Sequence, residues 1–211
     1  MKIAAFDVDV QKGFTPLCPE ELPVPGGDTI VPELEYMAGF ADYRIGSKDA
    51  HPDQAVWTVA TPEEMLQPLE YPEADLTWVK HCVPGTKGFE SLEGLPRPTE
   101  YDYYIWKGME PDLHPYGACY HDIHENLSTG VIEFLREREV GCVIVGGLAF
   151  DYCVQTTVWQ LQRAGFKVLV YLPATRGLTE EGTGKTKETF LHTKNIQMID
   201  NREELAAYFA K

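Results

Sequence analysis

The sequence predicts an α/β protein, a three-layer αβα sandwich around a mainly parallel, Rossmann-like sheet of about six strands. Two observations support this prediction. Short and nearly continuous apolar runs indicate strands that are buried on both faces, and segments of helical periodicity alternate with these runs along the chain. The length of 211 residues is typical of one domain, so we expect a single domain over residues 1–211.

The elements follow one another in a regular order. Six apolar runs predict the strands Ile3–Val8, Tyr43–Gly46, Tyr103–Trp106, Cys142–Gly147, Lys167–Leu172 and Ile196–Ile199. Five segments of helical period predict the helices Asp28–Phe40, Ser128–Glu139, Tyr152–Ala164, Glu180–His192 and Glu203–Ala210. Asp28 and Ser128 are of the types that cap helix N-termini, and Pro32 would fall in the first turn, where proline is tolerated.

One stretch interrupts this alternation. From about Asp49 to Glu100 the chain is rich in proline, glycine and acidic residues and shows no long periodic segment. Loops of this length inside a compact domain are uncommon and usually functional. We therefore expect the region at about 49–100 to contribute to a metal or substrate site.

The composition excludes several classes of partner. Acidic residues number 33 against 18 basic ones, and the net charge of −15 repels phosphate backbones and anionic lipids. We expect no nucleic-acid and no membrane partner, since no apolar run approaches the roughly 20 residues of a membrane span. Five cysteines without a C-x-x-C pair, and an N-terminus unlike a signal peptide, predict a soluble, cytoplasmic protein with free thiols.

Four chemically active residues follow predicted strands. In a parallel sheet the carboxyl ends of the strands share one edge, so Asp9, Asp49, Lys107 and Cys153 should lie near one another. Cys153 is near the start of a predicted helix, where the helix dipole favours the reactive thiolate. A cysteine, an acid and a lysine can form a nucleophile, its general base and an orienting cation. Each residue alone is more commonly a buried thiol, a turn aspartate or a surface lysine.

The long loop also contains residue types that bind metals. Asp49 and His51 form an Asp-x-His pair, and His81 lies in the same loop. A carboxylate and two imidazoles with open positions suit Zn²⁺, Fe²⁺ or Mn²⁺. Glu63 or Glu64 could add a further carboxylate. The other histidines show no comparable spacing, and we expect surface positions or a supporting role for His114, His121, His124 and His192.

Several motifs in one order carry a resemblance to a known family. They are Val8-Asp9-Val10-Gln11-x-x-Phe14, Asp49-x-His51-Pro52, Trp78-x-x-His81-Cys82-Val83-x-Gly85-Thr86, Lys107-Gly108 and Gly147-Leu148-Ala149-Phe150-Asp151-Tyr152-Cys153-Val154. With these motifs the chain resembles the nicotinamidase/pyrazinamidase family of the isochorismatase-like cysteine hydrolase superfamily. Asp-x-His together with Trp-x-x-His-Cys-Val is what narrows the resemblance to the metal-bearing branch.

The resemblance implies a catalytic triad of Asp9, Lys107 and Cys153. Cys153 would attack a carboxamide carbon and form a thioester, while Asp9 would take the thiol proton and pass it to the departing ammonia. Lys107 would keep the thiolate ionised. The family also has a cis peptide before Ala149, which would aim the amides of Ala149 and Cys153 at the developing oxyanion.

The same resemblance implies a metal and a set of substrate contacts. Asp49, His51 and His81 would bind one divalent transition metal, with Zn²⁺ as the first expectation and Fe²⁺ or Mn²⁺ as alternatives. Trp57 stands where some members carry a further loop histidine, so solvent, Glu63 or Glu64 would complete the metal's coordination. The metal would hold a pyridine ring nitrogen. The implied substrate contacts are Phe14, Trp78, Leu148 and Tyr116.

The implied activity is deamidation of nicotinamide, or of pyrazinamide-like amides, to the acid and ammonia. Two alternatives remain open at this stage. One keeps the triad and changes the substrate to another small heteroaromatic or carbamoyl amide, because several residues near the motifs depart from the family pattern. The other is a catalytically silent binder of small molecules on the same fold. Relatives of this kind often self-associate, so we expect a homo-oligomer.

Overall fold

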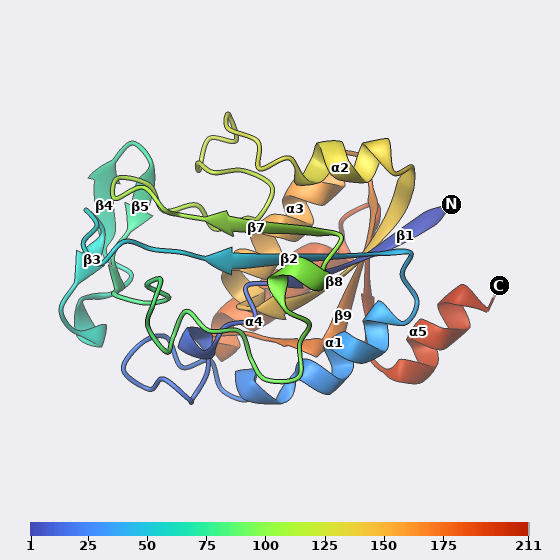
Figure 1. Ribbon diagram of the computed structural model, residues 1–211, viewed down its shortest axis with the longest axis horizontal. Helices are drawn as coiled ribbons and strands as arrows, with labels where there is room; N and C mark the ends of the chain where they lie inside the picture. The colour runs from blue at the N-terminus through green and yellow to red at the C-terminus, as the bar shows by residue number, and fades with distance from the viewer. Residues whose placement is uncertain (211) are drawn as a thin grey trace.

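The computed structural model describes residues 1–210 and is built around a six-stranded, wholly parallel sheet (Figure 1). The strand order is β10-β9-β8-β1-β2-β7. The strands are β1 Lys2–Val8, β2 Tyr43–Asp49, β7 Tyr103–Lys107, β8 Val140–Leu148, β9 Lys167–Arg176 and β10 Ile196–Ile199. All six expected strands are present, and β2, β7, β8 and β9 extend further toward their carboxyl ends than the apolar runs indicated.

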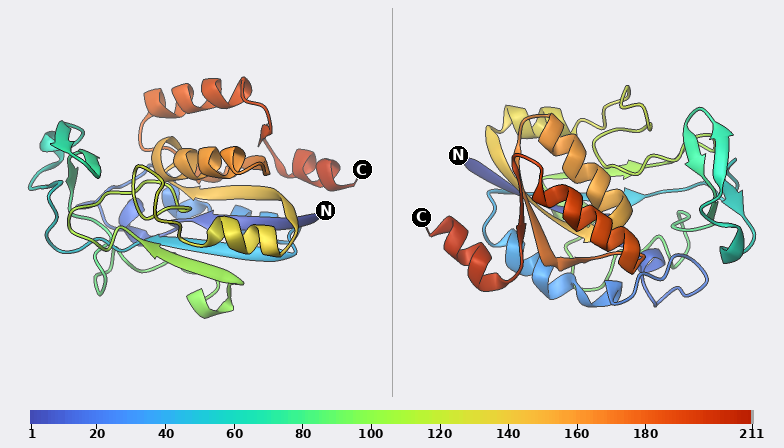
Figure 2. Two further views of the ribbon diagram at one scale, coloured as in Figure 1. Left: turned by 90° about the horizontal axis from the view of Figure 1, so that it is seen from above. Right: turned by 180° about the vertical axis from the view of Figure 1, so that it is seen from behind.

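Helices cover both faces of the sheet. They are α1 Val31–Ala38, α2 Val131–Glu137, α3 Gln155–Arg163, α4 Glu180–Leu191 and α5 Arg202–Phe209. Phe6 of β1 packs in a core with residues of α2, α3 and α4, whereas its neighbour Ala5 packs in a second core with α1 and α5. Figure 2 shows α3 and α4 on one face of the sheet. The three-layer αβα prediction is confirmed.

Two helix starts differ from the prediction. Asp28 does not cap a helix but lies in a short 3₁₀ turn, Gly27–Thr29, and α1 begins only at Val31. Pro32 explains the late start, because proline fits only the first turn of a helix. The segment that was expected to open α3 is instead a π-helical turn, Phe150–Val154, which precedes the helix.

The region between β2 and β7 contains short strands of its own. Thr58–Val59 (β3) pairs in parallel with Trp78–Val79 (β6), and Pro68–Tyr71 (β4) forms an antiparallel hairpin with Ala74–Leu76 (β5). In Figure 1 these strands lie beyond the arrowheads of β2 and β7, so the region covers the carboxyl edge of the sheet. None of the helices within residues 1–210 is both long and apolar enough to cross a membrane.

Close pairing of β1 and β8 brings the ends of these two strands together. Gly147 has a φ of 124°, and a Cβ atom at this position would lie 2.0 Å from the carbonyl oxygen of Val8. Only glycine tolerates both the conformation and the approach. The approach places Asp9, just after β1, beside the turn that follows β8.

Candidate active site and metal centre

Four neighbouring strands supply the polar residues at the carboxyl edge. Asp9 follows β1, Asp49 and Lys107 end β2 and β7, and Cys153 lies in the π-helical turn after β8. All four side chains are buried, and Asp9 and Lys107 have no exposed surface. The structure therefore brings together the four strand-end residues that the sequence singled out.

Lys107 lies at the centre of this group. Its Nζ is 3.1 Å from Oδ2 of Asp9 and 3.9 Å from Sγ of Cys153, and it also donates to Asp49 and to the carbonyl oxygen of Pro115. Burial opposes the charge, but the attraction of Asp49 and Asp9 outweighs it and raises the pKa of Lys107 well above its usual range. The ammonium group thus stays charged between two carboxylates and a thiol.

The two carboxyl groups beside Lys107 have different environments. Burial raises the pKa of Asp9 to about 6, although Lys107 and a hydrogen bond from Ser47 Oγ, at 2.7 Å, work in the opposite direction. Burial also acts on Asp49, but there Lys107 and His51 prevail and hold its pKa below the usual range. Asp9 is consequently the group that can exchange a proton near neutral pH, whereas Asp49 stays ionised.

The thiol of Cys153 differs from the expectation. We expected the helix N-terminus to favour the thiolate, but burial raises the pKa of this thiol well above its usual range despite the nearby Lys107. Cys153 itself lies in the π-helical turn and not in the first turn of α3. A reactive thiolate would therefore form by proton transfer to Asp9 rather than persist at rest.

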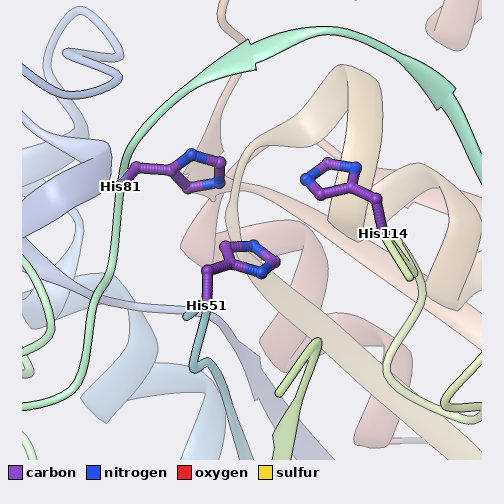
Figure 3. Close-up of side chains that lie close together, drawn as sticks. All are labelled: His51, His81 and His114. Carbon is purple, nitrogen blue, oxygen red and sulfur yellow. The ribbon is translucent and has the colours of Figure 1, made fainter. Parts of the chain in front are cut away.

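Three imidazoles converge near Asp49. His51 lies just after β2, His81 in the loop after β6 and His114 in the loop after β7. Figure 3 shows their rings directed toward a common centre. Nitrogen atoms of the three rings lie within 4.8 Å of one another, and Nε2 of His51 is 3.5 Å from Oδ2 of Asp49. All three side chains are buried.

Backbone carbonyl oxygens orient two of these rings. Nδ1 of His51 lies 3.1 Å from the carbonyl oxygen of Gly108, and Nδ1 of His81 lies 2.7 Å from that of Val79. Nδ1 therefore carries the hydrogen in both rings, which leaves the Nε2 lone pairs for a metal, as is usual for histidine ligands. A Cβ atom at residue 108 would lie 2.6 Å from the His51 ring, so this contact requires glycine.

The donor set fits a divalent transition metal. Nε2 of His51 and both ring nitrogens of His114 are buried without a hydrogen-bond partner among the described residues. Burial, with the neighbouring His51, lowers the pKa of His81 to about 3 and that of His114 well below the usual range, so both rings are neutral, the form that binds metals. Imidazoles beside an ionised carboxylate suit Zn²⁺ or Fe²⁺ better than Mg²⁺ or Ca²⁺.

A pocket of about 370 Å³ opens beside these two groups. Cys153 and Ala149 line one part, the metal-site residues Asp49, His81 and His114 another, and Phe14, Trp78, Tyr116 and Tyr152 supply aromatic walls. The pocket thus joins the thiol to the imidazole cluster through a space lined largely by apolar surface.

Comparisons with known proteins show the family of this chain. The sequence model of the isochorismatase domain matches residues 6–196, which is most of the chain. The chain belongs to the isochorismatase family. Among family members, a nicotinamidase of Acinetobacter baylyi is 29% identical over 206 residues, which cover 96% of this chain and 94% of that protein.

Solved structures of the family share the fold. The structure of a nicotinamidase/pyrazinamidase from Acinetobacter baumanii is 29% identical, with a TM-score of 0.81 over 97% of this chain and 98% of the other. A pyrazinamidase from Pyrococcus horikoshii, solved in complex with zinc, is 26% identical, with a TM-score of 0.74 over 95% of this chain and all of the other. The isochorismatase-like α/β architecture expected from the sequence is therefore confirmed.

The cis peptide implied by the family resemblance is present between Leu148 and Ala149. Of the four expected substrate contacts, Phe14, Trp78 and Tyr116 line the pocket, but Leu148 is not among its lining residues. Leu148 is fully buried, and its side chain packs toward Gly27 instead. Leu148 belongs to the same apolar core as the pocket-lining Phe14 and Trp78, but it does not reach the pocket surface itself.

His114 does not lie at the surface. We expected a surface position or a supporting role, and the burial of its side chain in the imidazole cluster contradicts the surface position. The sequence offered one indication of this position, because His114 comes seven residues after Lys107, in the loop that leaves the same edge of the sheet.

Glu63 and Glu64 are exposed on a 3₁₀ turn, where a carboxylate oxygen of Glu64 accepts from the backbone amide and the hydroxyl of Thr61. They do not join the cluster.

Proposed function

We propose that this protein is a metal-dependent cysteine amidohydrolase that converts nicotinamide to nicotinate and ammonia, and that also accepts pyrazinamide-like amides. The observation that carries the proposal is a pocket in which a buried thiol, with an acid and a lysine beside it, faces an imidazole cluster. Similarity to nicotinamidases along nearly the whole chain supports the same activity. The proposal includes a single cytoplasmic domain that forms a homo-oligomer.

The first half of the reaction acylates the enzyme. Asp9 accepts the proton of the Cys153 thiol, and Sγ forms a bond to the carboxamide carbon. The resulting oxyanion receives hydrogen bonds from the amides of Ala149 and Cys153. Removing one such donor from an oxyanion hole typically lowers the rate by about 10²–10³-fold. The C–N bond then breaks, Asp9 returns its proton to the nitrogen, and ammonia leaves a thioester on Cys153.

The second half releases the acid. Asp9, ionised again, takes a proton from water, whose oxygen attacks the thioester carbon. The C–S bond breaks, and the proton held by Asp9 returns to Sγ, which regenerates the thiol and frees nicotinate. Lys107 keeps Asp9 and Cys153 close together in both halves of the reaction and offsets the negative charge that develops between them.

Asp49, His51 and His81 would bind the metal, which when bound would hold the ring nitrogen of the substrate directly or through water. Phe14 and Trp78 would stack on the ring, and Tyr116 would close the pocket beside it. The hydroxyl of Tyr116 accepts from Nε1 of Trp78 at 3.1 Å and donates to Asp75 at 2.7 Å. These side chains position the amide at Cys153 and exclude bulk water.

An amide panel tests this proposal. Ammonia release is measured with the zinc-loaded protein for nicotinamide, pyrazinamide and benzamide, of which benzamide lacks the ring nitrogen. We expect nicotinamide to be the best of the three and benzamide to be poor, and a chelator to abolish turnover until Zn²⁺ is restored. Equal turnover of benzamide would contradict a metal-held ring nitrogen. No ammonia release from any of the three would favour a different amide or a silent binder.

A further inference from the structure

His114 is a buried imidazole without a protein partner. Its side chain has only 4% of its surface exposed, and neither Nδ1 nor Nε2 forms a hydrogen bond with any described residue. Buried polar groups in native proteins are almost always paired, so an imidazole with two unpaired nitrogens indicates a partner other than a protein side chain or backbone group.

The surroundings of His114 offer aromatic faces. The ring centroid of Trp57 is 4.4 Å away, that of Tyr116 is 4.9 Å away, and that of Trp78 is 5.8 Å away. On another side, His51 and His81 direct ring nitrogens toward it (Figure 3). The partner must therefore occupy the space among the three imidazoles.

The loop that carries His114 is held firmly. The amide of His114 donates to the carbonyl oxygen of Glu73 at 2.7 Å, and the carbonyl oxygen of Leu113 accepts from Nε1 of Trp57 at 2.8 Å. These bonds tie the loop to the β4–β5 hairpin and to the segment before β3. These contacts hold the backbone of the loop at the cluster, as an efficient metal site requires.

The spacing of the nitrogens suits one ion. Neighbouring donors around tetrahedral zinc lie about 3.4 Å apart at bond lengths of 2.0–2.1 Å. The nitrogens of His51, His81 and His114 lie within 4.8 Å of one another, so small inward rotations of the rings would complete the site. Asp49, whose Oδ2 is 3.5 Å from Nε2 of His51, supplies a carboxylate at the same centre.

We infer that His114 is a fourth protein ligand of the metal, which Asp49, His51 and His81 bind with it. Three imidazoles and one carboxylate select a borderline transition metal such as Zn²⁺. A fifth position would remain for water or the substrate ring. This inference rests on the metal dependence in the proposed function, but not on the identity of the amide.

X-ray absorption at the zinc edge tests the inference directly. The zinc-loaded wild-type protein should show three imidazoles around the metal, and His114→Gln should show two. His81→Gln shows how the spectrum and the zinc affinity change when an expected ligand is lost. His192→Gln is the matched control, because His192 is exposed at the end of α4, and should match the wild type. Zinc affinity is measured in parallel by competition with a chromophoric chelator.

His114→Gln should weaken zinc binding by at least about 10–100-fold, the loss typical of a residue that merely supports a ligand. Two imidazoles in the wild-type spectrum would overturn the inference without any variant, even if His114→Gln fails to fold. Unchanged zinc affinity in a folded His114→Gln protein would also overturn it. Neither measurement uses an amide, so failure of the proposed nicotinamide activity would register separately, in the ammonia assay.

Discussion

Replacing Lys107 with methionine should destabilise the protein strongly at pH 8 and much less at pH 5. The ammonium group is fully buried, with its Nζ 3.1 Å from Oδ2 of Asp9, and it donates to Asp49. Its removal leaves two buried carboxyl groups without the cation that lies between them. An uncompensated buried charge of this kind is among the costliest changes a folded protein can undergo.

The structure gives the size of the effect. At 3.1 Å the attraction between Lys107 and Asp9 is about 5 kcal/mol at an effective dielectric constant of about 20. Losing one member of a buried ion pair typically lowers the free energy of unfolding by about 3–5 kcal/mol, which agrees with this attraction. Without Lys107 the pKa of Asp9, raised to about 6 by burial, rises further. The folded variant then holds a proton that the unfolded chain releases at about pH 4, so the free energy of unfolding of the variant falls as the pH rises.

Urea unfolding of the metal-free proteins, in the presence of a chelator, measures this loss at both pH values. Lys80→Met is the matched control, because Lys80 pairs with Asp53 at 2.9 Å on the exposed surface. An exposed pair contributes less than about 1 kcal/mol at either pH. The reasoning is refuted if Lys107→Met costs no more than Lys80→Met at pH 8, or if its cost is the same at pH 5 and pH 8.

Two further predictions concern turnover. The value of kcat/KM for nicotinamide should fall as the pH drops through about 6, because burial raises the pKa of Asp9 to about 6 and only its ionised form accepts the thiol proton. A pH–rate profile checks this, and a flat acid limb would exclude Asp9 as the base. Tyr116→Phe removes the hydroxyl between Trp78 and Asp75 and should raise KM about tenfold with little change in kcat. Steady-state kinetics would count against this role if kcat fell instead.

The sheet could be predicted from the sequence because parallel strands buried on both faces leave an almost continuous apolar run. The same reasoning placed Asp9, Asp49, Lys107 and Cys153 at one edge, since residues after parallel strands share that edge. Helix starts were less accurate. Asp28 has a side chain that commonly caps helices, whereas Pro32 favours a later helix start. Only the folded chain shows which of these two effects determines where the helix begins.

Local sequence could not reveal contacts between distant loops. His114 is 33 residues from His81, and nothing in its neighbourhood resembles a ligand motif, yet Trp57 and Glu73 hold its loop at the cluster. The raised pKa of Cys153 likewise arises because the surrounding chain buries the thiol. The position of Cys153 just before α3 in the sequence does not reveal this burial. Long-range packing determines both features.

The central claim, that Cys153 is the nucleophile of an amide hydrolysis, is tested most directly by ammonia release from nicotinamide with three zinc-loaded proteins. Cys142→Ala is the matched control, because Cys142 is buried near the opposite end of β8. The wild type and Cys142→Ala should release ammonia at similar rates. Cys153→Ala, with unchanged metal content, should be slower by about 10⁴-fold or more. Turnover by Cys153→Ala at a rate close to that of the wild type would contradict the claim.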